Sequence, residues 1–93
     1  MSDVEKEILA DIDEKIEYLK NVRSRLINAD QEIKIIEENY EEKGCDSLCW
    51  IFLFVRSGLR KIIEYVEDEI KDKEKFKMQI MMVADSYQYE KER

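Results

Sequence analysis

Residues 26–66 read LINADQEIKIIEENYEEKGCDSLCWIFLFVRSGLRKIIEYV and place Gly44 between two runs of amphipathic sequence. On both sides of this glycine, apolar residues recur at alternating steps of four and three, a spacing that keeps them on one stripe of a helix. The first stripe comprises Ile8, Ile12, Leu19, Val22, Leu26, Ala29, Ile33, Ile36 and Tyr40, with one polar break at Lys15. The second comprises Leu48, Phe52, Val55, Leu59, Ile62, Val66, Phe76, Ile80, Val83 and Tyr87, with polar breaks at Glu69 and Lys73. Such stripes must be buried against another helix, so the sequence predicts an all-α fold, a long antiparallel helical hairpin with coiled-coil-like packing.

The helix boundaries follow from local signals. The 93 residues include no proline and two glycines, which favours a single helical domain over residues 1–93. We expect a first helix over about 3–43, begun by Ser2 and Glu5 as a capping box and ended by Gly44. A turn at about 44–46 then leads into a second helix over about 47–90, capped by Asp46 or Ser47. Either helix could be kinked, but the first stripe keeps its phase through residues 28–30, which favours an unbroken first helix.

Apolar residues also lie off the two stripes. One hairpin cannot bury them together with its stripes, so we expect a second hairpin to cover them in a dimeric four-helix bundle or a larger homo-oligomer. Residues 50–55 read WIFLFV and are all apolar, so we expect this segment to be the most buried part of that assembly. The candidate oligomer-interface residues are Ile16, Ile27, Ile35, Trp50, Ile51, Phe54, Ile63 and Ile70.

Residues that carry chemistry are scarce. The chain has no histidine and no glycine-rich phosphate loop, and its carboxylates fall mainly on the outer helix faces. We therefore expect no enzymatic activity, no cofactor and no metal site. Cys45 and Cys49 lie four residues apart, and buried thiols are the favoured interpretation. A zinc ion shared between two chains and an intersubunit disulfide are the alternatives.

The charge pattern limits the classes of partner. A net charge of −7 disfavours binding to nucleic acid or to anionic lipid over the whole surface. The sequence opens MSDVEKE, which does not resemble a signal peptide, and the apolar run at residues 48–55 is far shorter than a membrane span. We expect a cytoplasmic protein that does not enter a membrane.

Two acid-free stretches, 18–29 and 47–63, contain cations and should face each other across the hairpin. We call these cations the basic belt: Lys20, Arg23, Arg25, Arg56, Arg60 and Lys61. The basic belt is a candidate contact for an anion or for a partner's acidic surface. The alternative is that it pairs with acid-rich residues 37–42 of another copy of the chain.

These observations favour a small non-enzymatic homo-oligomeric helical protein that binds and modulates another macromolecule, as an adaptor, assembly factor or inhibitor does. The partners would then be the chain itself and another protein. The alternative is a binder of a small anionic ligand, such as a nucleotide, at a basic subunit interface. Nucleic-acid binding through the same belt is the least favoured function because of the net negative charge.

Overall fold

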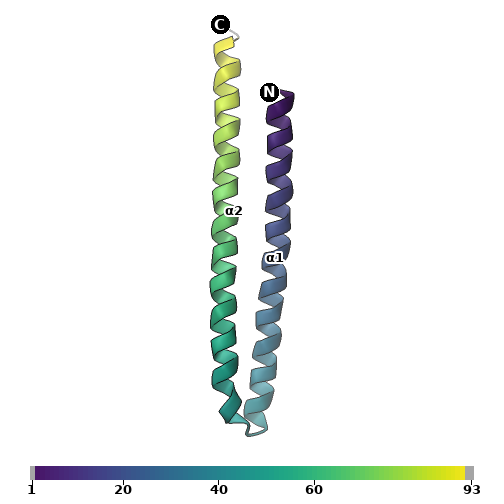
Figure 1. Ribbon diagram of the computed structural model, residues 1–93, viewed down its shortest axis with the longest axis vertical. Helices are drawn as coiled ribbons and strands as arrows, with labels where there is room; N and C mark the ends of the chain where they lie inside the picture. The colour runs from purple at the N-terminus through teal and green to yellow at the C-terminus, as the bar shows by residue number, and fades with distance from the viewer. Residues whose placement is uncertain (1, 92–93) are drawn as a thin grey trace.

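The computed structural model shows two long helices lying side by side in opposite directions (Figure 1). Helix α1 spans Asp3–Glu42, a short 3-10 helix η1 spans Asp46–Leu48, and α2 spans Cys49–Lys91. The structure describes the backbone of residues 2–91 and the side chains of residues 2–45 and 47–85, and no strand occurs within them. The Cα atoms extend over 75 × 15 × 14 Å. The prediction of an all-helical hairpin is therefore confirmed.

Local signals in the sequence set both ends of α1. At its start, the Ser2 hydroxyl accepts a hydrogen bond from the backbone N–H of Glu5 at 3.2 Å, as a capping residue does. At its end, Gly44 has a positive φ of 76°. The N–H of Cys45 donates to the carbonyl of Tyr40 at 2.8 Å, and the N–H of Gly44 donates to Glu41 at 3.0 Å. This pair of bonds is a Schellman motif with glycine at its left-handed position, so the predicted helix terminator is confirmed.

The second helix begins later than the sequence suggests. The α-helical hydrogen bonding starts at Cys49, two residues after the predicted start, because η1 occupies residues 46–48. The side chain of Asp46, one of the two expected caps, lies outside the described residues, as does that of Tyr87 at the end of the second stripe. From Cys49 onward α2 continues without a break through Gly58.

The two helices meet along a line of the least exposed side chains, which again recur at steps of four and three. We call these positions the seam. On α1 the seam comprises Glu5, Leu9, Ile12, Ile16, Leu19, Arg23, Leu26, Asp30, Ile33 and Glu37. On α2 it comprises Cys49, Phe52, Arg56, Leu59, Ile63, Val66, Ile70, Lys73, Lys77, Ile80 and Ala84.

Only half of each predicted stripe lies in the seam. Residues such as Ile12 and Leu59 point between the helices as expected, whereas Ile8, Ile36 and Ile62 are 42–48% exposed. The prediction that each whole stripe packs between the two helices is therefore wrong. The helices are rotated so that the residue after an exposed stripe position generally lies in the seam instead, as Leu9 does after Ile8 and Ile63 does after Ile62. This rotation leaves the charged breaks Lys15 and Glu69 outside the contact and brings Arg56 into it, where it is bonded to Asp30 and Glu37.

The hydrophobic core of the hairpin is small. Ile12, Ile16 and Ile70 form its buried centre, with Leu19, Val66 and Ile80 packed against them. Ile16 and Ile70, which the sequence suggested for the oligomer interface, are thus 5% and 4% exposed inside the hairpin. No described side chain is less than 2% exposed. A two-helix contact leaves one side of every seam residue near solvent, so the core is limited to a single row.

Candidate interaction surfaces

One side of the hairpin is apolar along most of its length. Because α1 and α2 run in opposite directions, the residues that immediately precede alternate seam residues, beginning with Leu9 on α1 and Cys49 on α2, lie on the same side of the hairpin in both helices. We call this side the apolar face; it comprises Ile8, Val22, Ala29, Ile36, Leu48, Val55, Ile62, Phe76 and Val83. A hollow of about 350 Å³ near the chain termini is lined by Ile8 together with Phe76 and Val83, which shows that the two helices contribute to one surface.

The apolar face is open to solvent. Among its large side chains on η1 and α2, the exposed fraction ranges from 39% at Leu48 to 69% at Val83. Its charged positions are Lys15 and Glu69, which carry opposite charges and have side chains 59% and 61% exposed. Each of them makes an ion pair within its own helix, Lys15 with Asp11 at 2.9 Å and Glu69 with Lys73 at 3.6 Å. Exposed pairs four residues apart contribute only a few tenths of a kcal/mol, so neither charge is fixed in place.

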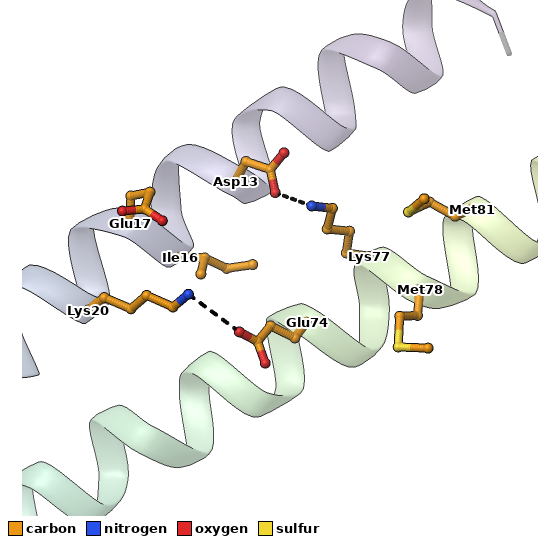
Figure 2. Close-up of a pocket in the computed structure, with 8 residues that line it drawn as sticks. All are labelled: Asp13, Ile16, Glu17, Lys20, Glu74, Lys77, Met78 and Met81. Atoms are coloured by element: carbon orange, nitrogen blue, oxygen red, sulfur yellow. Dashed lines mark hydrogen bonds and ion pairs between the residues drawn. The ribbon is translucent and has the colours of Figure 1, made fainter.

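The opposite side of the hairpin is charged. Figure 2 shows ion pairs crossing between the helices there, Lys77 with Asp13 at 2.6 Å and Lys20 with Glu74 at 3.9 Å. These groups border a shallow hollow of about 480 Å³, which Ile16, Met78 and Met81 also line. The side chains of the two ion pairs are 33–53% exposed, so the pairs contribute little to stability but keep this side hydrated. The hairpin therefore has one apolar face and one charged face.

A buried ionic cluster lies within the seam, nearer to the turn. The Nε atom of Arg56 donates to Oδ1 of Asp30 at 3.0 Å, and its Nη1 atom donates to Oε2 of Glu37 at 3.3 Å. Arg56 and Glu37 are 9% and 7% exposed. The hydrogen bond to Asp30 raises the pKa of Arg56 above the ordinary arginine value, and Glu37 adds to the effect while burial opposes it. The cluster joins α1 to α2.

This cluster changes the interpretation of the basic belt. Arg56, one of its six cations, points into the seam and is bonded to the chain's own carboxylates rather than exposed to a ligand. Lys20 lies on the charged face beside Glu74, and Arg23 is in the seam. Arg25, Arg60 and Lys61 are exposed at other positions around the two helices. The structure therefore does not bring the six cations together on one face, and Glu37 is already paired within the chain.

Three exposed apolar side chains, two of them aromatic, lie at the start of α2, beside the turn. Trp50 is 66% exposed, Leu53 is 55% exposed and Phe54 is 77% exposed. We call these three residues the turn-end cluster. Trp50 and Phe54 are four residues apart and so share one side of the helix. Within the hairpin alone, this segment is thus among the most exposed, although the sequence predicts that it is the most buried part of an assembly.

The remaining candidate interface residues fall into two groups. Ile63 is half-buried in the seam with Ile16 and Ile70. Ile27, Ile35 and Ile51 are exposed, at 38%, 58% and 40%. The apolar face itself was not predicted as an outer surface, because its residues were assigned to the contact between α1 and α2. Its signal was nevertheless present in the sequence as half of each stripe.

The thiols lie at the turn. Cys45 is a free, half-buried thiol, and Cys49 occupies the first seam position of α2. Among the described residues, no group of three or more histidine, cysteine, aspartate or glutamate side chains is arranged to hold a metal ion. Within the described residues, neither α1 nor α2 combines the length and the apolar composition that crossing a membrane requires.

Comparisons with known proteins found no match for this chain among protein-family models, curated proteins or solved structures. Its function is therefore inferred from its own surfaces.

Proposed function

We propose that this protein is a non-enzymatic interaction protein that associates with itself and binds another protein through the turn-end cluster. The observation that carries the proposal is the number of large apolar side chains that the hairpin leaves exposed, together with a total accessible surface larger than that of a compact protein. The chain exposes 7551 Å², whereas a compact protein of its 11.3 kDa exposes roughly 5,700 Å². Large contiguous apolar surfaces on small proteins generally mark contacts with other molecules.

The turn-end cluster has the composition of a binding site for a protein. Tryptophan and other aromatic side chains contribute most to binding energy at protein interfaces, because each buries a large area at a small cost in conformational entropy. Trp50 and Phe54 are offset around α2 from Val55 of the apolar face, so self-association through that face leaves the pair accessible. The alternative of an anion bound by the basic belt has no comparable support, because its cations lie on different sides of the hairpin.

Affinity purification of the full chain from its source cells would test the proposal, using the double variant W50S/F54S. The matched control is M78S/M82S, which removes a second exposed apolar pair with the same spacing on the same helix, 63% and 65% exposed. We expect wild type and the control to retain the same stoichiometric partner protein, and W50S/F54S to lose it without a change in oligomeric state. Retention of that partner by W50S/F54S would contradict the role of the turn-end cluster.

A further inference from the structure

We propose that the apolar face binds a second copy of this chain, with the two hairpins side by side and both turns at the same end. In this arrangement α1 of each copy faces α2 of the other, and Lys15 of each lies beside Glu69 of the other. The inference rests on the self-association in the proposed function and specifies its surface, its symmetry and its charge contacts.

The area of the exposed surface fits this occupant. The hairpin exposes roughly 1,800 Å² more than a compact protein of its mass. A stable two-protein interface covers about 800 Å² on each partner. Covering the apolar face along the length of the hairpin would therefore remove a large share of the excess. The face adds no net charge, because its charged positions, Lys15 and Glu69, cancel, so the net charge of −7 on each chain is carried elsewhere.

The sequence pattern also fits a four-helix bundle. Each predicted stripe combines seam positions, such as Ile12 and Leu19, with positions of the apolar face, such as Ile8 and Val22. In a single hairpin these two sets point in different directions, toward the other helix and out of the hairpin. In a bundle of two hairpins the stripe as a whole points toward the bundle axis, where the core of such a bundle lies. The stripes are thus explained by the assembly rather than by the hairpin alone.

The charged positions select between the two symmetric ways of joining the faces. The ion pairs between the helices and the ring contact of Tyr40 with Phe52 each join two residues whose numbers add up to between 86 and 94, and such residues lie at the same level of the hairpin. The numbers of Lys15 and Glu69 add up to 84, close to this range, so the two residues lie within about 10 Å of each other along the hairpin axis. If the two-fold axis of the dimer runs parallel to the hairpins, every residue keeps its position along that axis, and each Lys15 comes to the partner's Glu69. A perpendicular axis with full overlap would instead place Lys15 against the partner's Ala29 and Glu69 against the partner's Ile62. Unpaired charges against apolar side chains are costly, so the first arrangement is favoured.

With both turns at one end, the two turn-end clusters lie at the same end of the dimer, and one partner could contact both copies. Bivalent contact of this kind strengthens binding without any new type of contact.

The first experiment tests the surface. Sedimentation equilibrium of the full chain should give a dimer for wild type. I62D places a charge on the apolar face and should weaken the dimer at least a hundredfold. The control I35D changes an isoleucine that is exposed on another side of α1 and should leave the dimer intact. A dimer that tolerates I62D would overturn the proposed surface, and a monomeric wild type would overturn both this inference and the self-association of the proposed function.

The second experiment tests the pairing. K15E and E69K should each weaken the homodimer about tenfold or more, because each variant places like charges together twice. Mixing the two variants should restore a heterodimer of near wild-type affinity, because opposite charges then meet at both contacts. An ion pair within one chain could not be restored by mixing. A stable dimer that shows neither the loss nor the rescue would overturn the arrangement while leaving self-association intact.

The third measurement tests the orientation. A spin label on Cys45 in the C49A variant marks the turn of each copy. We expect a distance between labels below about 30 Å when both turns lie at the same end. A distance near 60 Å, about the length of a 40-residue helix, would show that the turns lie at opposite ends and would overturn the inference.

Discussion

The ionic cluster of Arg56 gives a prediction that can be worked out from the geometry. The substitution R56A removes two charge-assisted hydrogen bonds, of 3.0 Å and 3.3 Å. It leaves the carboxylates of Asp30 and Glu37, with side chains 17% and 10% exposed, without their shared cation. Breaking a fully buried ion pair costs about 3–5 kcal/mol. The hairpin is only two helices thick, so water lies close to the cluster, and we expect a smaller loss of about 2 kcal/mol.

Urea unfolding followed by circular dichroism at 222 nm would measure this loss, with every variant at the same protein concentration because self-association contributes to stability. The matched control is R60A, which removes an exposed arginine one turn further along α2 and should cost less than about 0.5 kcal/mol. The cost of R56A should change little in 0.5 M salt, because buried pairs are screened much less than exposed ones.

The same cluster has a defined pH dependence. The bond to Asp30 raises the pKa of Arg56, so its contribution to stability is complete below the ordinary arginine pKa and is lost only as the pH rises through the still higher folded-state value. The free-energy difference between wild type and R56A should therefore not decline between pH 7 and pH 10. A cost for R56A below about 0.5 kcal/mol, or equal to that of R60A, would refute the reasoning that the cluster holds the helices together.

Two further predictions concern the core and the glycines. I70A should lower the free energy of unfolding by about 2–3 kcal/mol, because it leaves a cavity at the buried centre. The control I35A, at an exposed site, should lower it by less than about 0.5 kcal/mol. Equal losses for the two variants in urea unfolding would contradict the assigned core. G44A should cost about 1 kcal/mol, because the φ of 76° is strained for alanine even though no atom lies within 4 Å of the added Cβ. G58A, within α2 and equally unobstructed, should instead stabilise the protein by about 0.5–1 kcal/mol, and opposite signs of the two shifts in Tm would check both.

The sequence by itself determined the hairpin and its turn. Gly44 ends α1 because only glycine adopts a positive φ at no cost, and Ser2 begins α1 because its hydroxyl binds a backbone N–H that has no partner within the helix. These signals act within a few residues of the chain and can be read without a fold. The spacing of the apolar residues likewise required two amphipathic helices.

The tertiary structure alone decided which side of each helix faces the other. Residues such as Ile12 belong to both the predicted stripe and the seam. The residues that flank them are both apolar at some levels, as at Ile8 and Leu9, whereas at others the flank that lies in the seam is charged, as at Arg56, so apolar periodicity alone does not identify the buried flank. The observed rotation brings Arg56 to Asp30 and Glu37, which are 26 and 19 residues away in the sequence. Pairing over such separations depends on how the helices align in space. The observed rotation leaves the more apolar flank of each helix on the outside of the hairpin, where it forms the apolar face.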